Sequence, residues 1–264
     1  MIIVNTLSQG NLDTFAAIRK YWNSELLEEL YFSPKKVPEE QKGRALADAG
    51  MRQQIQHLGM FLAGTDAESA CREILHAFEQ DTGFRTGDEK LFLILGCGTT
   101  TIYSIQYQGE PVYVLCLESV RGNKDRLRML LAHEYTHLIR AALLRKDIFE
   151  SCLGERLVTE GIAENYSAET VPGMQDRDYC IVEDAAAAWV LAHREDLRDM
   201  TKGHLEDASW IQNLFSMSAE IDFPVRTGYV YGYYAVRDYL LRKRLRVKDI
   251  LGADWKEILK EEEA

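Results

Sequence analysis

The chain has 264 residues, 46% of them apolar, which is enough to bury a substantial core. Its 42 acidic and 31 basic residues give a formal net charge of −11, and this negative charge works against a nucleic-acid partner. Five cysteines without C-x-x-C spacing indicate reduced thiols, so a cytoplasmic protein is expected. The sequence has neither a signal-peptide pattern nor an apolar run long enough to span a membrane, so no membrane partner is expected. No pattern predicts an oligomeric state.

Residues 1–85 are expected to form a helical amino-terminal lobe. Apolar residues recur at helical spacing between Asn11 and Phe78, and Phe15, Ile18 and Trp22 fall on one stripe. The pattern breaks at Ser33–Pro34.

Residues 86–264 are expected to form the second region, which begins with strands. The alternating and β-branched segments 91–95, 101–107 and 112–117 predict a small sheet between about 90 and 120, with a hairpin turn at 108–111. Helical patterns then predict helices at 124–146, 154–168, 182–199, 204–218, 228–243 and 247–262. This order predicts an α+β fold that is mainly helical.

The segment 130–138 carries the motif H-E-x-x-H within a proline-free helical run. His133 and His137 lie one helical turn apart, so both imidazoles can reach one metal ion. Glu134 follows the first histidine, at the position where a general base would take a proton from a metal-activated water. It also falls on an apolar stripe, where a carboxylate needs a partner or a task. These residues predict a zinc site, with a surface helix of coincidental composition as the alternative.

The next predicted helix supplies a candidate third ligand. Glu160 and Glu164 are four residues apart and therefore share one helix face. Glu160 is the expected ligand, and Glu164 is expected to hold a ligating imidazole through its other ring nitrogen. Gly161, next to the expected ligand, would let this helix and the motif helix approach closely. The alternative is a solvated face with salt bridges.

H-E-Y-T-H followed by T-E-G-I-A-E resembles the gluzincin metallopeptidases, in which a glutamate on the helix after the motif is the third zinc ligand. Within that clan the chain is most similar to the predicted zinc proteases of the YjaZ type, which combine this pair of motifs with a late G-Y-x-x-G-Y segment, here residues 228–233. The resemblance covers about residues 90–250. It implies a zincin-like fold with a small mixed β-sheet packed on the H-E-x-x-H helix.

The resemblance also implies further site residues. Tyr229, followed by Gly232, matches the Y-x-x-G element whose tyrosine stabilises the oxyanion of the transition state, and Tyr231 is the second choice. The alternative is that the five tyrosines of this helix only pack it: Tyr229, Tyr231, Tyr233, Tyr234 and Tyr239. An edge strand that pairs with the peptide substrate is expected at Val112–Leu117, including Tyr113 and Val114, unless this is an ordinary core strand. Arg226 is a candidate substrate contact or a surface arginine.

The sequence therefore predicts a peptidase with one Zn²⁺ per chain, held by His133, His137 and Glu160, that acts on a peptide or protein substrate with Glu134 as general base. Two alternatives keep the metal: a non-catalytic zinc protein that binds a peptide or a partner, and a zinc hydrolase with a non-peptide substrate.

Overall fold

The computed structural model describes residues 1–9, 12, 14–64, 66–146, 151–215 and 223–260. The chain divides into two compact units, Met1–Glu134 and Tyr135–Ala264. The division falls inside one long helix, α6 (Lys124–Leu144), and not near residue 85, where the sequence pattern placed it. The described chain is mainly helical with one small sheet, which confirms the α+β class.

The sheet has four strands in the order β1-β2-β4-β3. The strands are β1 (Ile2–Asn5), β2 (Lys90–Ile94), β3 (Ile102–Tyr107) and β4 (Glu110–Cys116). β1 and β4 both pair with β2 in parallel, whereas β3 pairs antiparallel with β4, so the sheet is mixed as expected. β1 and β3 therefore lie at the two edges.

The hairpin between β3 and β4 confirms the predicted turn. Gln108 and Gly109 both have positive φ, 53° and 83°, which suits the tight turns that join twisted antiparallel strands. The two inner strands are apolar over several consecutive residues because both of their faces are covered. Leu93, Val114 and Leu115, for example, have no exposed surface.

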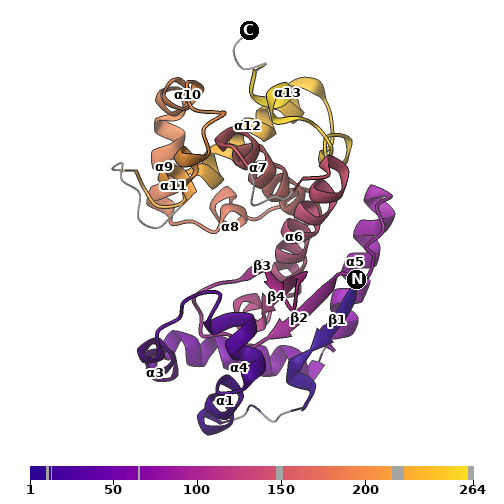
Figure 1. Ribbon diagram of the computed structural model, residues 1–264, viewed down its shortest axis with the longest axis vertical. Coiled ribbons are helices and arrows are strands. Elements are labelled where there is room, and N and C mark those ends of the chain that lie inside the picture. The colour runs from indigo at the N-terminus through magenta and orange to yellow at the C-terminus, as the bar shows by residue number, and fades with distance from the viewer. Residues whose placement is uncertain (10–11, 13, 65, 147–150, 216–222, 261–264) are drawn as a thin grey trace. The chain divides into compact units, whose positions relative to one another are not determined.

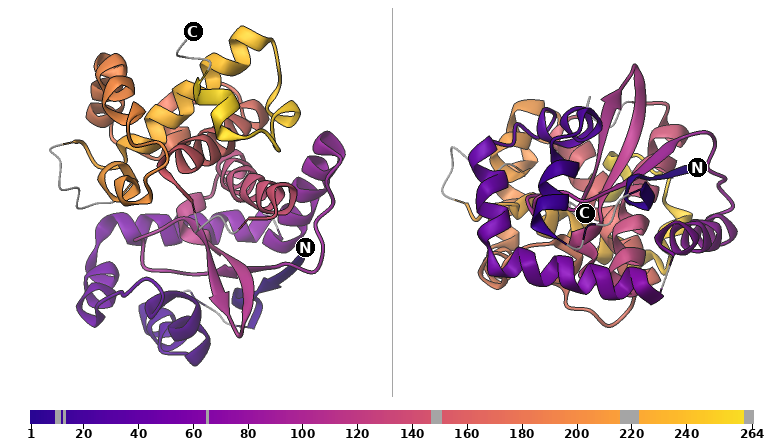
Figure 2. Two further views of the ribbon diagram at one scale, coloured as in Figure 1. Left: turned by 45° about the horizontal axis from the view of Figure 1, so that its top comes forward. Right: turned by 90° about the horizontal axis from the view of Figure 1, so that it is seen from below.

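Strand β1 was not predicted, and its position alters the expected amino-terminal lobe. Its four residues pair with β2, so the first residues of the chain belong to the sheet. Helix α5 packs against β1 (Figure 2). The helices of the first unit are η1 (Thr6–Gln9), α1 (Phe15–Trp22), α2 (Glu25–Leu27), the π-helical η2 (Glu28–Phe32), α3 (Glu39–Ala47), α4 (Ala49–Gly64), α5 (Ala67–Thr82) and η3 (Leu117–Val120). The predicted helix start at Asn11 lies outside the described residues.

In its described part, the second unit consists of helices and the segments that join them. They are the end of α6, α7 (Leu153–Thr170), α8 (Asp176–Cys180), α9 (Asp184–Ala192), α10 (Arg194–Lys202), η4 (Ala208–Trp210), α11 (Ile211–Phe215), α12 (Thr227–Lys243), η5 (Val247–Asp249) and α13 (Trp255–Lys260). The predicted helix 182–199 is divided at His193, which closes α9 and precedes α10. The ends of the predicted helices 204–218 and 247–262 lie in part outside the described residues.

Helices α7 and α12 pack very closely (Figure 1). A Cβ atom added to Gly161 would lie 2.2 Å from the Gly232 carbonyl oxygen, and one added to Gly232 would lie 2.3 Å from the Leu157 carbonyl oxygen. The close approach at Gly161 is therefore to α12 and not to the H-E-x-x-H helix α6, for which the sequence predicted it. Two glycines are required here because any side chain would push the backbones apart.

The tyrosines of α12 largely hold that helix in place. Asp176 accepts hydrogen bonds from the Tyr233 hydroxyl at 3.0 Å, the Tyr234 hydroxyl at 2.8 Å and Arg237 Nη1 at 2.9 Å. Tyr239 donates to Glu257 Oε1 at 2.9 Å. These bonds support the packing interpretation for three of the five tyrosines.

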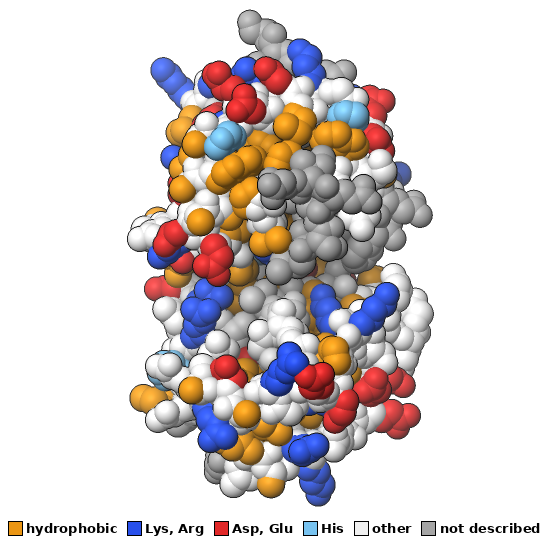
Figure 3. All heavy atoms as spheres, turned by 90° about the vertical axis from the view of Figure 1, so that its left-hand side faces the viewer, with side chains coloured by type: hydrophobic (Ala, Val, Ile, Leu, Met, Phe, Trp, Pro, Cys, Tyr) orange, Lys and Arg blue, Asp and Glu red, His pale blue; other side chains and the backbone are white. Residues whose placement is uncertain are grey.

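Basic and acidic side chains are interspersed over the face drawn in Figure 3. Within the described residues, no helix combines the length and the apolar character that a membrane crossing requires.

Candidate metal centre

The two motif histidines lie on α6, a helix of 21 residues. The side chain of Asn123 caps its first turn by accepting hydrogen bonds from the backbone N–H groups of Asp125 and Arg126. Apolar residues of the predicted stripe, such as Leu127, Leu130 and Leu131, are at most 2% exposed. Burial of these leucines fixes the rotation of α6 about its own axis and so the direction of the two histidines. His133 is partly exposed and His137 is buried.

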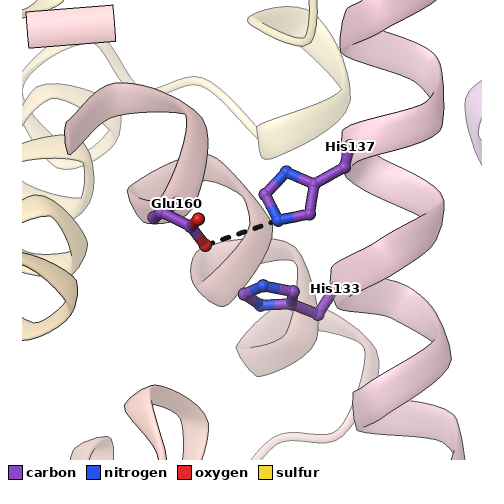
Figure 4. Close-up of side chains that lie close together, drawn as sticks. All are labelled: His133, His137 and Glu160. Atoms are coloured by element: carbon purple, nitrogen blue, oxygen red, sulfur yellow. Dashed lines mark ion pairs between the residues drawn. The ribbon is translucent and has the colours of Figure 1, made fainter. Parts of the chain in front are cut away.

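Glu160 lies in the middle of α7 and is 3% exposed. Figure 4 shows its carboxylate facing the two imidazoles, which extend from successive turns of α6. One ligand atom from each of His133, His137 and Glu160 can be chosen so that all three lie within 4.8 Å of one another. The structure therefore brings together the three residues that the sequence predicted as ligands.

The spacing and chemistry of these atoms fit a zinc ion. His137 Nε2 lies 3.4 Å from Glu160 Oε2. Ligands at about 2.0–2.2 Å from a tetrahedral zinc are roughly 3.3–3.6 Å apart, so this pair already has the separation of one tetrahedral edge. Two imidazole nitrogens with one carboxylate oxygen suit zinc better than Mg²⁺ or Ca²⁺, which prefer all-oxygen sites.

Glu134 is only 9% exposed, yet its carboxylate makes no hydrogen bond or ion pair with any described residue. Its negative charge acts on two neighbouring groups. Burial lowers the pKa of Lys35 and the charge of Glu134 opposes that shift, whereas burial and then the charge of Glu134 raise the pKa of Tyr113. A largely buried carboxylate without a bonded partner is costly, so the expected role of Glu134 as general base stays a prediction.

Glu164 does not hold an imidazole, so this part of the prediction is wrong. Its Oε2 accepts from Cys180 Sγ at 3.1 Å, and its Oε1 has no hydrogen-bond partner among the described residues. Cys180 lies on α8, and the spacing of residues along α7 gives no information on where α8 packs. Full burial, aided by the negative charge of Glu160, raises the pKa of Glu164 well above its ordinary value.

Tyr229 lies in the electrostatic field of the candidate ligand. Burial and then the charge of Glu160 raise the pKa of its phenol, while the cations Arg226 and Arg156 oppose the shift. Its ring contacts Phe215 edge-on at 5.0 Å between centroids. The hydroxyl makes no hydrogen bond with a described residue.

The other candidates on or beside α12 are placed as follows. The Arg226 guanidinium lies 4.0 Å from the centroid of the Tyr229 ring, and its Nη2 donates to the Cys180 carbonyl at 3.4 Å. Arg226 is thus partly buried beside Tyr229, and its contact with substrate stays a prediction. Tyr231 is 4% exposed, and its contact with substrate also stays a prediction.

The predicted edge strand is wrong. The segment Val112–Leu117 falls mainly on β4, which pairs with β2 on one side and with β3 on the other. The backbones of Val112, Tyr113 and Val114 are engaged in the sheet and cannot pair with a peptide. The cause is the sheet order, in which β2 pairs with one side of β4 and the hairpin places β3 on its other side.

The sequence patterns did not single out two arginines near the ligands. Arg156 Nε forms an ion pair with Glu160 Oε1 at 3.2 Å, and its i,i+4 spacing from Glu160 was a usable signal. Arg140 is fully buried and donates to Thr159 Oγ1 at 3.2 Å, to the Leu251 carbonyl at 2.9 Å and to Glu155 Oε1 at 3.3 Å. It therefore ties α6 to α7 within one turn of His137 and next to Glu160.

The fold and the site thus define a mainly helical α+β protein in which His133 and His137 of the H-E-x-x-H motif and Glu160 could hold a metal ion. Residues 90–260 match the profile of the family described as predicted Zn-dependent protease (DUF2268). This match covers well over half of the sequence, and the chain belongs to that family. No significant match was found among curated proteins or among solved structures.

Proposed function

We propose that this chain is a zinc-dependent peptidase of the gluzincin type, with His133, His137 and Glu160 as metal ligands and Glu134 as general base. The observation that carries the proposal is the arrangement of two imidazoles and a carboxylate from successive helices, whose ligand atoms lie within 4.8 Å of one another, with His137 Nε2 and Glu160 Oε2 3.4 Å apart. The family match and the resemblance to gluzincin motifs support it.

When bound, zinc would acidify a water molecule and polarise the scissile carbonyl. Glu134 stands directly after the first ligand on α6, with a carboxylate that no described residue engages. It takes the proton from the attacking water and passes it to the leaving amine. Three protein ligands leave one position of a tetrahedral site for water or substrate.

Tyr229 is the proposed oxyanion donor. Its raised pKa keeps the phenol protonated, so the hydroxyl has a proton to donate at neutral pH. A donor placed where negative charge develops lowers the barrier more than it stabilises the bound substrate. The Gly161–Gly232 contact supports this role, since it brings the turn of α12 that contains Tyr229 beside the turn of α7 that contains Glu160.

The substrate is proposed to be an extended peptide or a protein segment. Hydrogen bonds to the main chain of such a segment would accept many sequences and leave selectivity to side-chain pockets.

Metal analysis and peptide hydrolysis test the proposal together. The purified native chain should bind one zinc per chain and hydrolyse a mixed peptide pool, with loss of activity on chelation and recovery on zinc addition. Glu134→Gln should keep the zinc and lower kcat by about 10²–10⁴-fold, since it removes only the base. His133→Ala, His137→Ala and Glu160→Ala should each lose the metal.

Glu195→Gln is the matched control, because Glu195 is exposed on α10 and should behave as the native chain does. A native chain without zinc refutes the metal site. A chain that binds zinc but cleaves no peptide, in both the native and Glu134→Gln forms, refutes the peptidase and favours a binding protein or another hydrolase.

A further inference from the structure

We infer that Arg156 is a positioning residue that holds Glu160 in a monodentate orientation toward the metal. The inference rests on the proposed function, since it assigns a role within the same centre. It concerns the two oxygen atoms of one carboxylate, which face different partners.

The Glu160 carboxylate is divided between a cation and an imidazole. Its Oε1 lies 3.2 Å from Arg156 Nε, whereas its Oε2 lies 3.4 Å from His137 Nε2. Figure 4 shows the carboxylate with one oxygen directed to His137 and the other turned away from it. Only the oxygen on the His137 side is thus directed to the position where the three ligand atoms converge.

This division matters because a carboxylate can bind a metal through one oxygen or through both. A second oxygen would occupy the position that a catalytic zinc keeps for water or substrate. An ion pair on Oε1 favours the one-oxygen mode, because that oxygen would have to leave the guanidinium to reach the metal. Glu160 is 3% exposed, so solvent screens this attraction little.

Arg156 lies close to both Glu160 and an aromatic ring. It lies one turn before Glu160 on α7, at i,i+4 spacing, and its side chain is 23% exposed. The guanidinium carbon lies 5.8 Å from the centroid of Phe215, a ring that also contacts Tyr229. The cation is near enough to Tyr229 to lower the pKa of its phenol against the effect of burial. Arg156 is therefore directed to the ligand side of α7.

Cobalt substitution measures the coordination directly. Co²⁺ replaces Zn²⁺ in such sites, and its visible absorption is more intense with four ligands than with five. Native protein loaded with Co²⁺ should give the four-ligand spectrum. Arg156→Gln should give a weaker, five-ligand spectrum and a zinc affinity lower by about 10–100-fold, the usual effect of removing a residue that orients a ligand. Arg156→Lys, which keeps a cation, should restore most of both.

The matched control is Arg72→Gln on α5, which breaks an exposed i,i+4 pair with Glu68 and should leave both readouts unchanged. A folded Arg156→Gln with native spectrum and affinity overturns the inference, as does an Arg156→Lys no better than Arg156→Gln. Should Arg156→Gln fail to fold by circular dichroism, Arg156→Met is judged by the same criteria, and the Lys comparison still decides. If the native chain binds neither Co²⁺ nor Zn²⁺, the proposed function itself fails; if it binds them normally, only the role of Arg156 is at issue.

Discussion

The contact between α7 and α12 gives a prediction that links packing to catalysis. In Gly161→Ala the new methyl would lie 2.2 Å from the Gly232 carbonyl oxygen and 2.8 Å from Val236 Cγ2. Carbon and oxygen atoms in ordinary close contact are about 3.3 Å apart, so the helices must separate by roughly 1 Å.

That separation has a cost in stability and a larger one in rate. Overpacking of this kind costs about 1–3 kcal/mol, and the better helix propensity of alanine returns about 1 kcal/mol, so a net loss of up to about 2 kcal/mol is expected. A displacement of about 1 Å in a catalytic group can reduce the rate about 10²-fold. Since Tyr229 is proposed to act in the transition state, the loss should appear mainly in kcat and little in KM.

Urea unfolding and steady-state peptide hydrolysis measure the two effects. The matched control is Gly59→Ala in the interior of α4, where a Cβ meets nothing within 4 Å. This control should gain about 0.5–1 kcal/mol and keep full activity. A Gly161→Ala protein that is as stable as Gly59→Ala and retains its kcat would refute the reasoning about the helix contact.

Two further predictions concern buried charges. Glu118 is fully buried and accepts hydrogen bonds from the backbone N–H groups of Gly96 and Gly98, and burial raises its pKa from 4.5 to about 7. Because the folded form binds the proton more tightly, the free energy of unfolding should fall by up to about 3 kcal/mol as the pH rises from about 4.5 to 7. The urea midpoint of Glu118→Gln should depend less on pH over that range than the midpoint of the native chain. Equal pH dependence in the two proteins would contradict this. Arg140→Met should lower the free energy of unfolding in urea by about 3–5 kcal/mol, since it leaves Glu155 and two carbonyl groups without their buried donor. The exposed control Arg198→Met should lower it by almost nothing. Similar values for both variants would show that the buried network contributes little.

The candidate ligand set could be predicted because each step depended on local spacing. His133 and His137 are one turn apart on a helix whose apolar stripe is evident, and Glu160 lies on the next helix. The hairpin of β3 and β4 was likewise a local feature, marked by its turn residues.

The errors concern contacts between segments that are distant in sequence. Glu164 shares the right helix face with Glu160, but its partner Cys180 belongs to α8. The inner position of β4 depends on β2 on one side and β3 on the other, which strand patterns alone do not order. β1 was missed because four residues give too short an apolar pattern to distinguish a strand.

The parallel pairing of β1 with β2 has a consequence for the order of folding. Residues 2–5 pair with residues 90–93, and the amino group of Met1 donates to Thr86 Oγ1 across 85 positions of sequence. During synthesis the first strand therefore leaves the ribosome long before its neighbour exists. Closing so large a loop delays this pairing relative to the hairpin of β3 and β4, which needs a turn of only a few residues. The hairpin is expected to be the early part of the sheet, and β1 the last strand to join it.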